Sequence, residues 1–491
     1  MGLGQRPLGR QAGIDPVLQR VRGDLVEKGL GECHRVDLAL ADALPQRRCA
    51  HACQIAHHRP SFFAVAALVA AAQRMDNPAR GRIFALMEHD CDILIVGGGL
   101  NGPALALAAA KAGLKSIVID ALPEAAHTQE DFDGRGYALA LSSVRMLDNL
   151  GLWERLEPNA QPMREIKVTD GRVGDAQVFL GLHFDSAEIE EGPMGQMVED
   201  RYLRRALLEA MEANPLVEQR AGETVIAQET GPGGISVTLA SGETLRARLL
   251  VGADGRRSGT AARAGIRRTG WGYGQTALVC AIAHEKPHHG VAHQFFMPPG
   301  PLAILPLPGN RSSIVWSETE AQARAINALP DDQYLEVLSP RFGDFLGEIS
   351  LAEKRFVYPL NLTLANSFIA ERLALVGDAA HGMHPIAGQG LNAGLRDVAA
   401  LAHVLSHAQR RGEDIASPLV LARYQQWRRF DTASLAAATD LFNRLFSNDS
   451  ALLRFGRDLG MAAINAVPGL RRGFIREAAG ITGDLPELMR D

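Results

Sequence analysis

Three glycines near residue 100 have the spacing of a loop that binds phosphate groups. Gly97, Gly99 and Gly102 form a G-x-G-x-x-G pattern. In such a loop the first glycine allows a tight turn, the second lets the backbone approach a pyrophosphate, and the third lets a helix touch a strand. The helix that follows presents free amides and a partial positive charge to the phosphates. Because the chain contains 50 glycines, the spacing alone is a weak signal, and the flanking sequence must decide.

The flanking sequence has the elements that such a loop requires. An apolar run at 93–96 predicts a buried parallel strand, and an alanine-rich stretch from Pro103 predicts a helix. A second predicted strand at 117–119 ends in Asp120, which can accept hydrogen bonds from both ribose hydroxyls of an adenosine. The alternatives are a glycine-rich turn without a nucleotide and an ordinary acid at a strand end. We expect a dinucleotide-binding βαβ unit.

Two later segments place an aspartate at the end of an apolar strand. One ends in Asp254 and Gly255, and the other ends in Asp378 and is followed by a glycine-rich stretch at 388–394. In order and approximate spacing, these segments and the glycine loop resemble the single-component flavoprotein aromatic hydroxylases, the group that contains para-hydroxybenzoate hydroxylase. The resemblance extends over about residues 88–450 and is specifically to the hydroxylase branch of ubiquinone biosynthesis.

This resemblance implies an α/β protein with a Rossmann-type FAD-binding domain, a substrate domain with a mixed or antiparallel sheet, and a helical C-terminal tail. Residues 1–86 lack a clean hydrophobic period, and we expect them to be a disordered extension or the product of a misassigned start codon, with Met87 beginning the folded enzyme. The expected segments are 87–161, 197–269 and 358–405 for a discontinuous FAD-binding domain, 162–196 and 270–357 for the substrate domain, and 406–491 for the C-terminal helices.

The resemblance also implies FAD as the bound cofactor and NAD(P)H as a transient electron donor. No second G-x-G-x-x-G follows a strand, so we expect the donor to bind in a groove. Reduced flavin would react with O2 at C4a, and the hydroperoxide would pass its terminal oxygen to an electron-rich ring. The protein then has to hold that ring against the flavin and exclude water.

Roles for individual residues follow from the resemblance. Asp378 is expected to accept hydrogen bonds from the ribityl chain, and Pro385 to line the side of the flavin where oxygen reacts. Leu391 and Asn392 are expected to contact the pyrimidine edge of the flavin, where negative charge develops on reduction. The resemblance also implies that Arg135 contacts the cofactor. It implies that Asp254 and Gly255 contact both FAD and the electron donor. The complete set of expected cofactor-binding residues is Gly97, Gly99, Gly102, Asp120, Arg135, Asp254, Gly255, Asp378, Gly388, Gly390, Leu391 and Asn392.

Purely structural roles are also open for three residues. Asp378 could cap a helix, His381 could be a satisfied buried histidine, and Arg135 could be a solvated surface charge. One departure from the family pattern concerns donor recognition. Ala261 stands where the family usually has an arginine, and the nearest arginine is Arg263.

The reaction implied by the resemblance is hydroxylation of the aromatic ring of a polyprenyl phenol in ubiquinone biosynthesis. Hydroxylation of a small soluble phenol in aromatic catabolism is one alternative, and a catalytically silent FAD-binding scaffold is another. We expect an apolar substrate pocket, whose candidate lining residues suit a plain core equally well: Phe295, Phe296, Leu305 and Leu307. The sequence identifies no catalytic base, and it does not distinguish the ring carbon, NADH from NADPH, or the oligomeric state.

Composition excludes several other classes of protein. A formal net charge of −5 provides no basic surface for nucleic acid. The five cysteines are scattered without a paired motif, which predicts no metal site and a reducing cytoplasm. The longest apolar run, at 62–72, is about half the ~20 residues of a membrane-spanning helix. A lipid-tailed substrate nevertheless implies peripheral contact with the inner face of the membrane and association with other ubiquinone-biosynthesis proteins.

Overall fold

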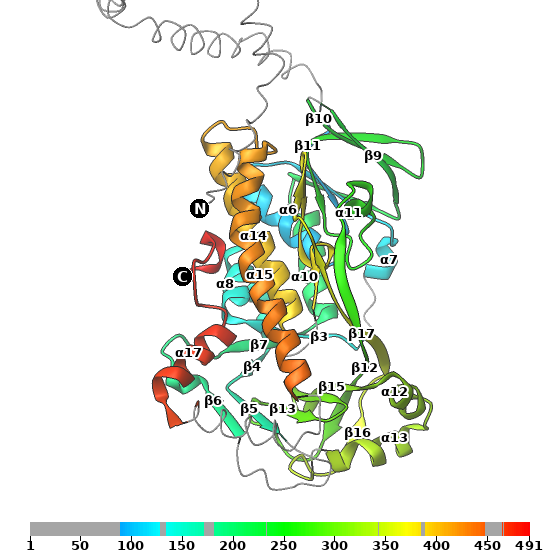
Figure 1. Ribbon diagram of the computed structural model, residues 1–491, viewed down its shortest axis with the longest axis vertical. Coiled ribbons are helices and arrows are strands. Elements are labelled where there is room, and N and C mark those ends of the chain that lie inside the picture. The colour runs from blue at the N-terminus through cyan, green and yellow to red at the C-terminus, as the bar shows by residue number, and fades with distance from the viewer. Residues whose placement is uncertain are drawn as a thin grey trace, which may run out of the picture. The chain divides into compact units, whose positions relative to one another are not determined.

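The structure is a computed structural model that describes residues 89–127, 134–170, 181–231, 233–341, 343–383, 388–446, 464 and 466–491. The expectation for residues 1–86 lies outside the described residues. Two large sheets and one small sheet, with helices packed on them, make up the described chain (Figure 1).

The first large sheet contains the predicted βαβ unit. Its parallel centre has the order β19-β11-β1-β2-β8, and β18, β10 and β9 extend it antiparallel. Ile93, Leu94 and Ile95 are fully buried in a core to which α6 (Asn101–Lys111) and α14 (Gln389–Arg410) contribute. Its strands are β1 (Cys91–Val96), β2 (Ser116–Asp120), β8 (Val217–Ala221), β9 (Val225–Gly231), β10 (Gly234–Leu239), β11 (Thr244–Gly252), β18 (Ile369–Ala370) and β19 (Leu373–Leu375).

Three helices connect this sheet to the rest of the molecule. The alanine-rich α6 (Asn101–Lys111) follows the glycine loop, and its small side chains let α14 (Gln389–Arg410) pack closely against it. The long α15 (Pro418–Phe446) then runs beside α14 (Figure 1). The N-terminal end of α14 and the later turns of α15 thereby reach the region between the two large sheets.

The second large sheet has nine strands in the order β20-β17-β12-β15-β14-β13-β5-β6, with β16 paired to β12. All described pairings in it are antiparallel except that of β13 with β5. Its strands are β5 (Glu165–Asp170), β6 (Gly181–Asp185), β12 (Arg268–His284), β13 (Val291–Met297), β14 (Gly300–Leu307), β15 (Arg311–Thr319), β16 (Ile349–Leu351), β17 (Phe356–Ala365) and β20 (His381–Gly382). Because strand side chains alternate between faces, one face packs on α12 (Glu320–Asn327) and α13 (Asp331–Leu338), and the other is free to line a cavity.

A three-stranded sheet in the order β3-β7-β4 is the smallest of the three. It comprises β3 (Gly136–Ala140), β7 (Gly195–Glu199) and β4 (Gln161–Met163). The remaining α-helices are α7 (Glu124–His127), α8 (Leu141–Asn149), α9 (Trp153–Leu156), α10 (Asp200–Glu212), α11 (Gly259–Arg263) and α17 (Pro468–Ala478).

The predicted fold class is confirmed: a Rossmann-type α/β unit, a mixed and largely antiparallel second sheet, and a C-terminal part that is helical. The exact division of the chain into domain segments stays a prediction. No helix in the described part of the chain is long and apolar enough to cross a membrane.

Candidate active site

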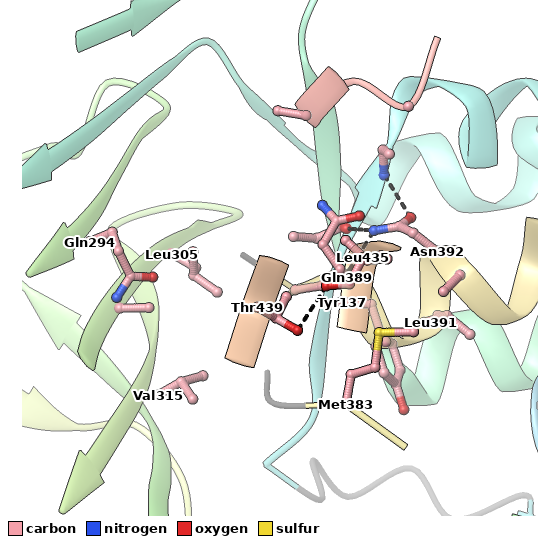
Figure 2. Close-up of a pocket in the computed structure, with 18 of the residues that line it drawn as sticks. Tyr137, Gln294, Leu305, Val315, Met383, Gln389, Leu391, Asn392, Leu435 and Thr439 are labelled. Carbon is pink, nitrogen blue, oxygen red and sulfur yellow. Dashed lines mark hydrogen bonds between the residues drawn. The ribbon is translucent and has the colours of Figure 1, made fainter. Parts of the chain in front are cut away.

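One cavity of about 1900 Å³ lies where the two large sheets approach each other. Its walls come from the first residues of α6, the start of α14, part of α15 and α17, and the strands of the second sheet (Figure 2). Pockets for one small molecule usually measure about 300–1000 Å³. This cavity therefore has room for an extended cofactor and a second molecule beside it.

The glycine loop borders this cavity, and its three glycines meet different surroundings. Gly97 has a φ of 117°, and a Cβ atom there would lie 2.3 Å from the carbonyl oxygen of Ala253. A Cβ atom at Gly102 would lie 1.9 Å from the carbonyl oxygen of Gly97, so this glycine lets α6 touch the loop. Gly99 lines the cavity, and a Cβ atom there would meet no atom within 4 Å. Gly99 therefore keeps space open on the cavity side, as a bound pyrophosphate requires.

Asn101, the first residue of α6, supports the fit of a ligand at this helix end. It lines the cavity, and its Oδ1 atom is buried without a hydrogen-bond partner among the described residues. A buried polar atom without a partner costs about 1–3 kcal/mol. A hydroxyl or amide of a bound molecule would supply the missing donor, and the site thus suits the polar chain of a dinucleotide.

Asp120 lies under the glycine loop and outside the cavity lining. One carboxylate oxygen accepts a hydrogen bond from the Gly98 amide, and the other accepts one from the Leu122 amide at 2.7 Å. The carboxylate therefore fixes the shape of the loop. Its expected contact with an adenosine ribose stays a prediction.

Asp254 and Gly255 also lie outside the cavity lining. The Asp254 carboxylate accepts hydrogen bonds from the Ser258 hydroxyl and, at 2.9 Å each, from the backbone amide and hydroxyl of Thr260. It thus holds the turn into α11. Arg263 donates to the Val225 carbonyl at 3.1 Å, so it points to β9 and does not replace the arginine missing at Ala261.

Asp378 lines the cavity in the turn that follows β19. It is not the cap of a helix. Its Oδ2 atom accepts a hydrogen bond from Nε of Arg256 at 2.9 Å, and both side chains are partly exposed. Its backbone carbonyl accepts one from Arg268 at 2.7 Å. Arg256 and Arg257 line the cavity as well, so this end of it is positively charged.

A buried ion network behind this turn was not predicted from the sequence. Asp397 is fully buried and accepts hydrogen bonds from His381 Nε2 at 2.5 Å, Arg428 Nε at 2.8 Å and the Gly377 amide at 3.0 Å. Burial raises the pKa of Asp397, but the charges of His381 and Arg428 outweigh burial and hold this pKa below its ordinary value. His381 is thus a structural partner of Asp397 through Nε2. Its Nδ1 atom is buried without a hydrogen-bond partner among the described residues, so it is not the fully satisfied histidine of the alternative. The sequence signal that could have indicated this network is Asp397 itself, an acidic residue among the apolar residues of α14.

Arg135 belongs to a second polar cluster at the cavity wall. It forms an ion pair with the buried Asp200 at 3.4 Å, and the same carboxylate accepts hydrogen bonds from the Tyr137 hydroxyl at 3.0 Å and from Arg204 Nε at 3.0 Å. Arg135 remains 42% exposed, and it lines the cavity. Asp200 therefore anchors an arginine that can still reach a ligand.

The start of α14 is fastened to β3 by Asn392. Its Oδ1 atom accepts hydrogen bonds from the Ala140 amide at 2.9 Å and the Ser143 hydroxyl at 2.8 Å. Its Nδ2 atom donates to the carbonyls of Ala138 at 2.8 Å and Gly388 at 3.2 Å. The side chain is thus fully engaged within the protein, which leaves the backbone of this segment to face a cofactor.

The neighbours of Asn392 complete the helix end. Gly388 has a φ of 64°, and Gly388, Gly390, Leu391 and Asn392 all line the cavity. The backbone amides at the first turn of a helix have no partners within the helix and favour negative charge. Pro385 lies outside the described residues.

The second sheet supplies an apolar wall opposite this helix end. Phe296 and Leu305 line the cavity, as expected. The expectation is wrong for Phe295 and Leu307, which do not line it. Phe295 points to the core on the other face of the sheet, and Leu307 is fully buried beside Met163 and Met197.

Comparison with known proteins agrees with this geometry. Residues 90–437 match the FAD binding domain family. The ubiquinone hydroxylase UbiL of Rhodospirillum rubrum is 46% identical over 84% of this chain and 95% of its own length. The 3-demethoxyubiquinol 3-hydroxylase of Escherichia coli is 36% identical over 81% of this chain and 100% of its own length.

A solved structure shows the same fold. The p-nitrophenol 4-monooxygenase PnpA from Pseudomonas putida has a TM-score of 0.68 at 19% identity, covering 81% of this chain and 99% of that one. The family follows from the sequence relatives. The chain belongs to the FAD-dependent monooxygenases, in the branch formed by the hydroxylases of ubiquinone biosynthesis.

Proposed function

We propose that this chain hydroxylates the aromatic ring of a polyprenyl phenol in ubiquinone biosynthesis. The observation that supports this most directly is the cavity of about 1900 Å³, with polar helix ends at one side and an apolar sheet wall at the other. Bound FAD, once reduced by NAD(P)H, would activate O2, of which one atom enters the ring and the other leaves as water. The residues of the chain bind both partners, orient the ring and keep water out.

In this proposal the cofactor follows the polar side of the cavity. The loop of Gly97, Gly99 and Gly102 and the α6 amides hold the pyrophosphate, Asp120 lies toward the adenosine ribose, and Asp378 lies toward the ribityl chain. Arg135, just before β3, contacts the cofactor from the cavity wall. The start of α14, from Gly388 through Gly390 and Leu391 to Asn392, offers its amides to the flavin. Asp254 and Gly255 shape the adjoining turn, and Pro385 is assigned to the oxygen side.

The size and chemistry of the cavity favour a lipid-tailed phenol over a small soluble one. A compact phenol together with FAD would leave much of an apolar cavity of this volume filled by water, which is unfavourable. A long hydrocarbon tail fills such a space and buries its own surface, at about 0.8 kcal/mol for each CH2 group. The relatives named above carry ubiquinone-pathway names, which points the same way.

A substrate that resides in a bilayer requires access from the membrane, and we propose peripheral contact through α17. Leu470 and Phe474 are 53% and 43% exposed, lie four residues apart on this helix, and Phe474 also lines the cavity. An adjacent face of α17 is held by the buried Ile475 and by the ion pair of Arg471 with Glu188 at 2.7 Å. An exposed apolar face at the rim of the cavity suits contact with lipid. Association with other proteins of the pathway stays a prediction.

The proposal is tested with the purified chain, whose absorption spectrum is followed under NADPH with and without farnesyl phenol. We expect bound flavin with a band near ~450 nm, faster bleaching when the phenol is present, and a product one oxygen atom heavier by mass spectrometry. Flavin without a hydroxylated product from any phenol would instead favour the silent scaffold. Equal turnover of tailed and untailed phenols would favour the catabolic alternative.

A further inference from the structure

The sheet wall of the cavity is formed by β13, β14 and β15, and its side chains are nearly all apolar. The side chains that face the cavity there include Ala292, Phe296, Leu305 and Val315. Among the described residues of these three strands, Gln294 is the only one with a side-chain amide that lines the cavity. Figure 2 shows Gln294, Leu305 and Val315 on these strands, across the cavity from Leu391 and Asn392 at the start of α14.

The neighbouring His293 also borders the cavity, but its side chain points away from it. Side chains along a strand alternate between the two faces of a sheet, so His293 and Gln294 point to opposite sides. The His293 ring lies 4.5 Å from the ring of Phe345 and stacks on Phe295, which belongs to the core on the other face. Burial lowers the pKa of His293 to about 4, so this ring is neutral at pH 7.

The orientation of the Gln294 amide follows from its partner. Nε2 donates a hydrogen bond to the carbonyl oxygen of Leu302 on β14 at 3.3 Å. Because a carbonyl oxygen can only accept, the NH2 group must face Leu302, and the opposite orientation would set two oxygens against each other. The carboxamide oxygen is thereby directed away from the strand, toward the cavity (Figure 2).

We propose that the carboxamide oxygen of Gln294 accepts a hydrogen bond from the hydroxyl group of the phenol and so selects and orients the ring. This inference rests on the proposed function, since it concerns the same cavity and the same substrate class. The apolar wall contacts the ring and gives it no rotational preference. One fixed acceptor defines which edge of the ring faces the sheet and which carbon faces the start of α14.

This arrangement distinguishes a phenol from its ether. A hydroxyl group donates to the Gln294 oxygen, whereas a methoxy group has no donor and would leave a buried acceptor without a partner. An amide is not a base, so Gln294 holds the phenol and does not take its proton.

The test compares farnesyl phenol with its O-methyl ether, on the wild-type holoenzyme and on Gln294→Met, which keeps the length of the side chain and removes its acceptor. The control is Leu305→Met, which puts the same methionine into the same wall. Equilibrium dialysis in the absence of NADPH gives the dissociation constants. Turnover gives the fraction of NADPH consumption that ends in hydroxylated product. Flavin content and circular dichroism check that each variant is folded.

Wild type should bind the phenol roughly tenfold more tightly than the ether, which corresponds to one lost hydrogen bond. In Gln294→Met the two affinities should come within about twofold, and the hydroxylated fraction should fall because the ring is no longer oriented. Leu305→Met should retain the preference for the phenol. A Gln294→Met enzyme that keeps this preference, or a wild type that never shows it, would overturn the inference. Absence of any hydroxylated product from wild type would instead overturn the proposed function, while the binding preference still reports on Gln294.

Discussion

Two glycines of the phosphate-binding loop are glycines for different physical reasons. A Cβ atom at Gly97 would collide with the Ala253 carbonyl in a backbone conformation that other residues rarely adopt, whereas one at Gly99 would enter the cavity and touch no protein atom. Gly97→Ala should therefore lower the free energy of unfolding by at least about 2 kcal/mol. Gly99→Ala should leave the stability of the apoprotein unchanged and weaken FAD binding. Urea unfolding and FAD titration of both variants measure these effects. If the two variants lost stability and FAD affinity to the same extent, the two glycines would not have different roles.

Asp397 provides a second contrast, with Asp431 as its matched control. Both carboxylates pair with Arg428, at 2.8 Å and 2.9 Å, but Asp397 is fully buried and the side chain of Asp431 is 42% exposed. Asp397→Asn leaves a buried guanidinium without its main counter-charge and should cost about 3–5 kcal/mol of stability. Asp431→Asn should cost less than about 1 kcal/mol. Thermal unfolding compares them, and similar losses would show that the burial of the pair does not matter.

The same carboxylate predicts a dependence of stability on pH. The pKa of Asp397 in the folded protein is below its ordinary value, so the unfolded chain binds the proton more readily. Its contribution to stability is complete above pH of about 4, the ordinary pKa of an aspartate, and is lost as the pH falls through the folded pKa. The acid limb of the stability curve should therefore be steeper in wild type than in Asp397→Asn.

At the scale of elements, the position of α14 depends on one amide side chain. The Asn392 amide group donates to two carbonyls, of Ala138 and Gly388. Asn392→Asp would set a carboxylate oxygen against them and should cost about 2 kcal/mol or more. FAD affinity should fall as well, because the first turn of α14 would leave β3. Asn392→Ser keeps a smaller hydrogen-bond donor, so it should lose less stability and less FAD affinity than Asn392→Asp. Denaturation and FAD titration test this, and an unchanged FAD affinity in Asn392→Asp would exclude the coupling.

The elements that local sequence determines were predicted, and the ties between distant elements were not. The strand, glycine loop and helix from 93 onward depend on hydrophobic runs and turn chemistry within about 30 residues. Asn392 bonds to residues 249–254 positions away, and no local pattern indicates such a partner. The error at Phe295 has a different cause. Alternation along β13 was recognisable, but which face lines the cavity depends on the packing of α12 and α13.

At the scale of the whole molecule, α17 brings exposed apolar residues to the rim of the cavity. Val467 and Leu470 are 46% and 53% exposed and do not line the cavity. The double change Val467→Ser with Leu470→Ser should weaken binding to phosphatidylcholine and phosphatidylglycerol vesicles about tenfold, because two side chains no longer enter the lipid. FAD content should stay unchanged.

The control for this experiment is Leu419→Ser. Leu419 is 78% exposed, but it lies about 30 Å along α15 from Thr439, which lines the cavity. Loss of this more exposed side chain far from the rim should leave vesicle binding intact. Cosedimentation with vesicles measures all three proteins. Equal binding by the double variant and wild type would remove α17 as the contact surface.

The shared carboxylate of Asp397 has a thermodynamic consequence for the C-terminal half of the chain. It bonds both to the Gly377 amide, beside the turn assigned to the ribityl chain, and to Arg428 in the middle of α15. If cofactor binding stabilises that turn, it therefore also stabilises the position of α15. Coupling of this kind is reciprocal. If a substitution on α15 changes the affinity for FAD by some factor, then bound FAD changes the effect of that substitution on the folding equilibrium by the same factor. The helix α15 is thus energetically part of the cofactor site, and its middle turns, including Arg428, also border the cavity.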